Sequence, residues 1–165
     1  MADNFSFDVV SKIDTQHLKE SIQVALKEVT NRYDFRGTDT RIEFDEKAWL
    51  LTLTTADDYK VKSLWEILTM RMAKQGIPLK NFEPQEPESA LGGAVRQKVK
   101  ITQGIPTDKA REIVAAVKRS GIKVQVSIQA DQLRVASSKK DLLQEAIAFL
   151  KSGDFGVTLQ FTNYR

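Results

Sequence analysis

The 165-residue chain contains no cysteine and only one histidine, His17. Without thiols there is no disulfide, no thiolate ligand for a metal and no cysteine nucleophile, and this lack fits a cytoplasmic location. Zinc sites are built mainly from Cys and His, so such a centre is not expected. His17 precedes a core-facing Leu18 and falls on the polar side of its predicted helix. The sequence therefore predicts no metal and no other cofactor.

Long hydrophobic runs are absent too, since no apolar stretch approaches the roughly 20 residues that cross a bilayer. The start, MADNFSFDVV, has neither the basic stretch nor the apolar run of a secretory signal. Catalytic and phosphate-loop motifs are also missing, with no HExxH, no glycine-rich P-loop and no nucleophile motif. We expect a cytoplasmic protein that is not an enzyme and has no membrane partner.

Charge is plentiful but unevenly distributed along the chain. Residues 1–89 contain 12 Lys and Arg against 16 Asp and Glu, whereas residues 90–165 contain 13 against 6. The second half therefore has a net charge of +7, and the first half −4. A basic domain attracts polyanions such as nucleic acids, although a positive surface can also serve solubility alone.

Proline and glycine are scarce, and several of them gather near the middle of the chain. The segment EPQEPESALGG at 83–93 contains Pro84, Pro87, Gly92 and Gly93, which is typical of a linker. It divides the chain into a first domain at 1–89 and a second at 90–165. Each is near the lower size limit of a stable domain.

The two halves show the same order of apolar patterns. Alternating apolar residues predict strands, and apolar residues spaced three and four apart predict helices. The first half has predicted strands at 5–10, 41–45, 49–55 and 79–82, and helices that begin after Asp14 and after Asp57 or Asp58. The second half has predicted strands at 94–102, 123–129, 132–137 and 157–163, and helices around 110–117 and 142–150. This order predicts an α+β protein of two ferredoxin-like βαββαβ domains in tandem, each with one open sheet face.

Alternate side chains of a strand point to opposite faces, so the apolar set of each strand identifies the open face. In the second half this face is predicted to be basic and rich in amides and hydroxyls. Lys and Arg bind phosphate, while Gln can contact base edges and Tyr can stack on them. We expect ligand contacts from Arg96, Lys98, Lys100, Lys123, Gln125, Arg134, Tyr164 and Arg165. The alternative is that these side chains only protect an exposed sheet from pairing with other sheets.

Two loops add candidate contacts. SSKKD at 137–141 begins the last helix, where Ser137 or Ser138 is expected as the cap and Lys139 can meet a phosphate at the helix N-terminus. NRYDFRG at 31–37 follows the first helix and offers Arg36 as a ligand contact, with Gly37 permitting a positive φ. Both segments also fit structural roles, as a capped helix start and as a turn.

Several blocks of the sequence together resemble one known family. FSFDVVSKID, NRYDFRGT, KVQVSIQADQLRV, SKKDLLQEAI and the closing LQFTNYR are similar to the YajQ family of bacterial nucleotide-binding proteins, over essentially the whole chain. The resemblance implies two ferredoxin-like domains that exchange their first strands, with FSFDVV in the second sheet and VRQKVKIT in the first. It also implies binding of nucleotides or nucleic acid, with cyclic di-GMP as a signalling ligand in some members.

Three classes of function remain. The leading hypothesis is a non-enzymatic nucleotide-binding protein, a cyclic di-GMP effector that acts through a regulatory protein or a nucleic acid. The alternative is a general RNA-binding module using the basic open face; the charge favours it. The strand 132–137 has no outward aromatic, however, and an RNA-recognition domain of the same fold needs such aromatics. The third class, a nucleotide-hydrolysing enzyme, lacks a metal or base constellation.

Overall fold

The structure is a computed structural model that describes residues 5–165. It divides the chain into two compact units. Ile13–Ile101 form one, called here the central unit, and the segments before Ile13 and after Ile101 form the other, the terminal unit. These units take residues from both sides of the expected boundary at 89/90, and each is described by itself below.

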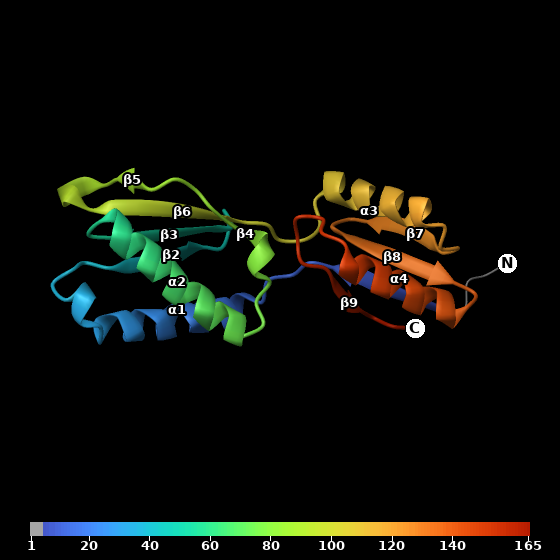
Figure 1. The fold of residues 1–165 in the computed structure, drawn as a ribbon, viewed down its shortest axis with the longest axis horizontal. Helices are drawn as coiled ribbons and strands as arrows, with labels where there is room; N and C mark the ends of the chain where they lie inside the picture. Colours follow the sequence, from blue (N-terminus) through green and yellow to red (C-terminus); the bar gives the residue numbers. More distant parts are fainter. Residues whose placement is uncertain (1–4) are drawn as a thin grey trace. The chain divides into compact units, whose positions relative to one another are not determined.

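The central unit is an antiparallel sheet covered on one face by two helices (Figure 1). The strand order is β2-β3-β6-β4. Strand β4 pairs with the C-terminal part of β6, and β5 pairs with its N-terminal part. Its elements are α1 (Thr15–Thr30), η1 (Tyr33–Phe35), β2 (Arg41–Asp45), β3 (Leu50–Thr55), α2 (Asp58–Lys74), η2 (Leu79–Asn81), β4 (Phe82–Pro84), β5 (Glu88–Ser89), η3 (Leu91–Gly93) and β6 (Val95–Ile101). Apolar side chains of α1 and α2, such as Leu18 and Leu68, pack on Leu51, Leu53 and Val99 of the sheet.

The terminal unit repeats this arrangement with its own core. The strand order is β7-β8-β1-β9, again antiparallel throughout. Its elements are β1 (Phe5–Val10), α3 (Thr107–Ser120), β7 (Gln125–Gln129), β8 (Gln132–Ser137), α4 (Lys140–Ser152) and β9 (Gln160–Thr162). Phe7 and Val9 of β1 are fully buried against Ile113, Leu133 and other side chains of this core. Two antiparallel sheets with four helices, within residues 5–165, confirm the predicted α+β fold class.

Strands β1 and β6 both pair with strands from across the expected boundary at 89/90. β1 pairs with β8 and β9, so the N-terminal strand is an inner strand of the terminal sheet. β6 pairs with β3 on one side and with β4 and β5 on the other, so the strand after the linker is an inner strand of the central sheet. Each sheet thus needs a strand from the other half of the sequence.

Most predicted helix boundaries have a visible cause. Asp14 caps α1 by accepting from the backbone N–H of His17 at 3.1 Å, and Asp57 caps α2 through the N–H of Lys60 at 2.8 Å. Gly121, with φ of 80°, ends α3 in the left-handed conformation that favours glycine. The N-cap of α4 is Lys139, whose own side chain makes no capping bond, and the hydroxyl of Ser137, an expected cap, accepts from the backbone N–H of Lys139 at 3.0 Å.

Candidate functional site

The open face of the central sheet displays three kinds of side chain, sorted by strand. Alternation buries Ile42, Leu51, Leu53, Val99 and Ile101 under the helices. The other set therefore lies on the opposite face: Arg41, Glu43 and Asp45 on β2, Leu50, Thr52 and Thr54 on β3, and Arg96, Lys98 and Lys100 on β6. A strand with two carboxylates and Arg41 and a strand with three cations thus flank one that carries hydroxyls.

The strand register aligns these side chains in rows. Glu43 lies opposite Thr52, and Thr52 lies opposite Lys98, so one row runs from carboxylate through hydroxyl to ammonium. In the neighbouring row Thr54 lies between Arg41 of β2 and Arg96 of β6, so that row has a cation at each end. Adjacent strands are about 4.8 Å apart, so a row across three strands spans roughly 10 Å.

A cavity of about 760 Å³ lies on this face. Its polar lining includes Glu43, Thr52, Thr54, Arg96 and Lys98. A second hollow of about 460 Å³ shares Glu43, Thr54 and Arg96 with it, so the recess continues along the sheet. Binding sites for small molecules commonly have volumes of about 300–1,000 Å³. The open face therefore has both the size and the polar groups of a ligand site.

Internal partners occupy part of this lining. Glu88 accepts from Arg96 Nε at 3.0 Å and lies 3.9 Å from Lys98 Nζ. Among the acidic residues at the cavity, Asp45 accepts from the backbone N–H of Ala48 and Glu46 pairs with Lys19 at 3.1 Å. The side chain of Glu43 makes no hydrogen bond or ion pair within the described residues, and its charge acts on the nearby Arg41, so its carboxylate remains available to a ligand.

On the terminal sheet the predicted contact Arg134 is already engaged. Its Nε donates to Asp8 Oδ1 at 3.0 Å, and Asp8 also accepts from Asn163 at 2.8 Å. Asp8 is only 5% exposed, yet the hydrogen bond from Arg134 holds the pKa of this carboxyl below its ordinary value, against the opposing effect of burial and with help from Asn163. Arg134 therefore serves as the counter-ion of a buried carboxylate.

A bulge corrects the predicted facing of Tyr164. Thr162 lies opposite Asp8, but Arg165 exchanges both backbone hydrogen bonds with Ser6. A step of two residues on β1 is thus matched by three on the C-terminal segment, which is a β-bulge. Asn163, with φ of 55°, supplies the extra residue and turns its amide to Asp8. The ring of Tyr164 instead lies 6.2 Å from Phe7, on the helix side. The bulge also ends β9 at Thr162, one residue before the predicted end.

The ten sequence candidates are therefore divided between the units. Arg96, Lys98 and Lys100 lie on the open face of the central sheet, and Arg36 lies in a loop of the same unit. Lys123 and Gln125 are exposed at the edge strand β7, and Lys139 is exposed before α4. Arg134, Tyr164 and Arg165 belong to the terminal sheet, with Arg134 and Tyr164 engaged as described.

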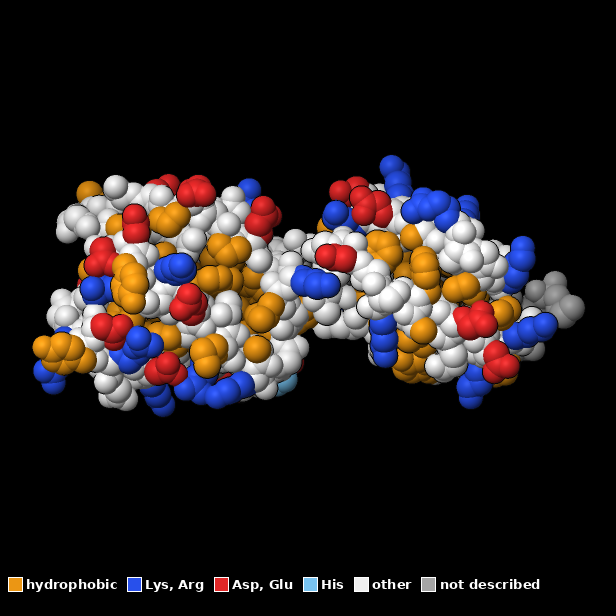
Figure 2. All heavy atoms as spheres, in the orientation of Figure 1, with side chains coloured by type: hydrophobic (Ala, Val, Ile, Leu, Met, Phe, Trp, Pro, Cys, Tyr) orange, Lys and Arg blue, Asp and Glu red, His pale blue; other side chains and the backbone are white. Residues whose placement is uncertain are grey.

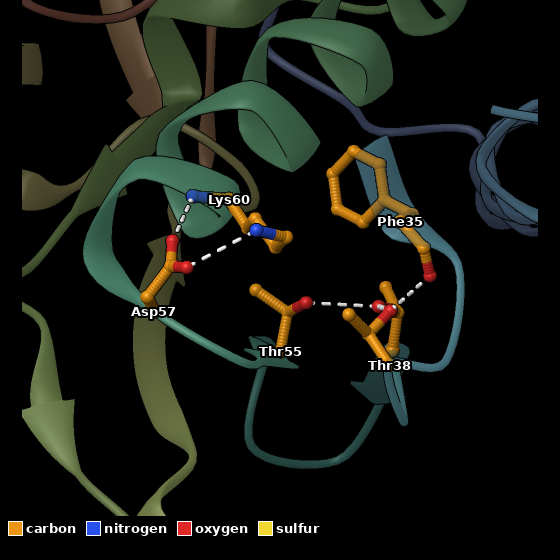
Figure 3. A network of polar contacts seen from close by, with 6 residues as sticks. Phe35, Thr38, Thr55, Asp57 and Lys60 are labelled. Atoms are coloured by element: carbon orange, nitrogen blue, oxygen red, sulfur yellow. Dashed lines mark hydrogen bonds and ion pairs between the residues drawn. The ribbon is translucent and has the colours of Figure 1, made fainter. Parts of the chain in front are cut away.

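The loop after α1 is fixed by a chain of hydroxyls (Figure 3). Thr38 Oγ1 donates to the carbonyl of Phe35 at 2.6 Å, and Thr40 Oγ1 lies 2.8 Å from the hydroxyls of both Thr38 and Thr55. A hydroxyl has one hydrogen, so Thr40 must donate to Thr38 and Thr55 must donate to Thr40. This chain ties the NRYDFRGT segment to the end of β3.

Arg36 stands on this fixed loop with no carboxylate partner among the described residues. Its guanidinium lies 5.6 Å from the ring centroid of Tyr33, whose side chain is exposed. The neighbouring Arg32 makes a bidentate pair with Asp34, both contacts at 3.0 Å. Arg36 lines a hollow beside α1 with Gly37 and Thr38, separate from the lining of the open-face cavity.

Of the residues that line the cavity, only Arg96 and Lys98 were predicted from the sequence, and those missed include Glu43, Thr52 and Thr54. The signal was present, because RIEFD and LLTLTT alternate as clearly as the strands of the second half. Alternation does not show the pairing of β6 with β3, which brings the cations of residues 96–100 beside these side chains. Only the family resemblance implied that VRQKVKIT belongs to the first sheet. The predicted basic face of the second half therefore combined residues 96–100, which lie in the central sheet, with residues such as Arg134, which lie in the terminal sheet.

Residues 5–165 contain neither a cluster of metal-ligating side chains nor a helix suited to cross a membrane. No group of three or more His, Asp or Glu is placed there to hold a metal ion. Among the helices of this part of the chain, none combines the length and apolar character that a membrane crossing requires.

Comparison with known proteins gives a consistent result over the full length. The family described as "Nucleotide-binding protein YajQ-like" matches residues 5–165. A protein of Elusimicrobium minutum named "Nucleotide-binding protein" is 58% identical over the whole of both chains. Nucleotide-binding proteins of Koribacter versatilis and Carboxydothermus hydrogenoformans are 47% and 42% identical, over all of this chain and 99% and 100% of theirs. The chain belongs to the YajQ family.

Proposed function

We propose that this chain is a non-enzymatic, cytoplasmic nucleotide-binding protein whose ligand lies on the open face of the central sheet. The names of its relatives support the ligand class. The observation that carries the location is the 760 Å³ cavity, in which Arg96 and Lys98 stand across from Glu43 with two threonine hydroxyls between them.

The lining matches the parts of a nucleotide. Arg forms bidentate contacts with phosphate oxygens and Lys contributes a compact positive charge, so Arg96 and Lys98 are suited to the phosphate end. The hydroxyls of Thr52 and Thr54 can both donate to and accept from a ribose. The proposed contacts only bind the nucleotide, and we expect it to be released chemically unchanged.

The finer proposal is that the ligand is cyclic di-GMP and that the chain passes its signal to a regulatory protein or a nucleic acid. Support comes from the sequence blocks shared with the family. A cyclic dinucleotide carries two phosphates, and β6 presents one cation to each of two neighbouring rows of the sheet, Lys98 and Arg96. The row of Arg96 also carries Arg41 on β2.

General RNA binding is supported less well, because most of the charge difference between the two halves of the sequence disappears when each residue is counted with its own structural unit. The central unit holds 14 Lys and Arg and 14 Asp and Glu, and the terminal unit holds 11 and 8. The net charges are 0 and +3, against −4 and +7 for the two halves of the sequence. On the face shown in Figure 2, basic and acidic side chains are interspersed. A polyanion binder usually presents a continuous basic stripe.

Calorimetry on the full chain tests the proposal. Cyclic di-GMP, other nucleotides and a short single-stranded RNA are titrated at two salt concentrations. Lys98→Ala should weaken nucleotide binding roughly tenfold through the lost charge-assisted contact, while Lys27→Ala, on the exposed side of α1, should not. RNA binding with a steep salt dependence and no response to Lys98→Ala would favour the RNA module instead. Conversion of the nucleotide during titration would show an enzyme.

A further inference from the structure

We infer that Glu43 selects guanine by accepting hydrogen bonds from the Watson–Crick edge of the base. The inference rests on the proposed nucleotide site and assigns the base end of it. Glu43 stands on β2, across the cavity from the cations of β6, and faces the open side of the sheet.

The row Glu43–Thr52–Lys98 presents a carboxylate, a hydroxyl and an ammonium group in the order that suits the base, the ribose and the phosphate of a nucleotide. Two strand spacings separate the carboxylate strand from the ammonium strand, roughly 10 Å, and a nucleoside monophosphate is about as long as that from base edge to phosphate. With phosphate at Lys98 and ribose over Thr52, the base edge reaches β2. The side chain that meets it there is Glu43.

The other carboxylates at the cavity have internal roles that Glu43 lacks. Asp45 holds the β2–β3 turn through the N–H of Ala48, and Glu46 pairs with Lys19 of α1. Glu88 lies on the basic side, against Arg96. Glu43 lines both the larger cavity and its neighbour and has no such bond among residues 5–165. It is therefore the carboxylate that a ligand can engage without breaking an existing contact.

The chemistry of the bases then determines the preference. Guanine presents two adjacent donors on its Watson–Crick edge, N1–H and the N2 amino group, which match the two oxygens of one carboxylate. Adenine presents N1 as an acceptor at the same place, and its lone pair faces a carboxylate unfavourably. An ionised carboxylate only accepts, so it cannot adapt to adenine by turning over. Hypoxanthine keeps N1–H and lacks the amino group, and is the intermediate case.

The test compares ligands that differ only in the base. Cyclic di-GMP, cyclic di-IMP and cyclic di-AMP are titrated by calorimetry into the full chain, and the three 5′-monophosphates GMP, IMP and AMP form a second series. The variants are Glu43→Gln, which keeps the shape of the side chain, and Glu66→Gln, which removes the same charge from the exposed side of α2. Thermal melts confirm that both variants fold.

The wild type should bind the guanine ligand about tenfold to a hundredfold more tightly than the adenine ligand, with the hypoxanthine ligand between them. Glu43→Gln should weaken the guanine ligand and leave or improve the adenine ligand, because a repelling charge is gone. Glu66→Gln should retain the wild-type preference. Equal affinity for the three bases, or a preference that survives Glu43→Gln, would overturn the inference and leave nucleotide binding intact. Failure of both ligand series to bind would overturn the inference together with the proposed function.

Discussion

At the scale of single residues, Asp8 shows how a local pattern can mislead. Alternation in FSFDVV alone would make Asp8 one more polar side chain on the face opposite Phe7 and Val9. It is instead a buried carboxylate that accepts hydrogen bonds from Arg134 and Asn163. Because Arg134 is paired with Asp8, it is less available to bind a phosphate. Isolated buried charges are very costly, so the three residues act as one structural unit.

Replacing Asp8 with Asn should lower the free energy of unfolding at neutral pH by about 1–3 kcal/mol, since Arg134 loses its charged partner. The pKa of Asp8 is lowered in the folded state from an ordinary value of 3.8. Its stabilising effect is therefore complete above that value and is lost as the pH falls through the folded pKa. Urea denaturation from pH 7 to pH 2 should show the wild type and Asp8→Asn converging below about pH 4. A constant difference down to pH 2 would mean that ionisation of Asp8 is irrelevant to stability.

At the scale of elements, the two-residue strand β5 affects the charge of the proposed phosphate site. Pairing of Glu88 with Arg96 across the ladder places an internal carboxylate on the two cations of the proposed phosphate site. Both ion pairs are substantially exposed to solvent, so their contribution to stability is small. Their effect on an incoming anion is direct, because the ligand must replace Glu88.

Glu88→Gln should therefore raise nucleotide affinity by about two- to fivefold while leaving the melting temperature nearly unchanged. Calorimetry with cyclic di-GMP measures the first effect, and a thermal melt the second. Glu86→Gln, two residues away in the same exposed segment, removes an equal charge without touching Arg96 and should change affinity less. A similar gain from both variants would point to long-range charge alone.

Element by element, the sequence allowed the fold class to be predicted and the site only in fragments. Alternation in 94–102 correctly buried Val99 and Ile101 and exposed Lys98, because one face of that strand is packed under helices. The same rule failed at Tyr164, where Asn163 adds a residue to the strand and reverses the facing. A bulge depends on a single backbone conformation, and nothing in the apolar pattern records it. Nor does alternation record which strands pair, and that pairing brings Lys98 beside Thr52.

At the scale of the whole molecule, the terminal unit is formed by two segments of the chain, one before Ile13 and one after Ile101. The central unit is one continuous segment, Ile13–Ile101, and contains every buried residue of its core. The terminal unit depends on β1, which lies between β8 and β9 and buries Phe7 and Val9. Division of the chain at 89/90 would therefore remove an inner strand from both sheets.

A fragment of residues 13–101 should fold alone, whereas fragments 1–89 and 90–165 should not. The first keeps all strands of the central sheet, while the other two lose β6 and β1 from the sheets that need them. Amide dispersion in NMR spectra and cooperative thermal melts distinguish folded from unfolded fragments. Well-dispersed spectra of both 1–89 and 90–165 would contradict the strand assignment, and an unfolded 13–101 fragment would show that the central unit depends on the rest of the chain.

The central claim is that the open face of the central sheet is the nucleotide site, and an amide NMR titration of the full chain with cyclic di-GMP tests it most directly. The largest shifts should fall on β2, β3 and β6, around Glu43, Thr52 and Lys98, and these shifts should be lost in Lys98→Ala. Shifts confined to the terminal sheet, or to the loop around Arg36, would contradict it and place the ligand elsewhere.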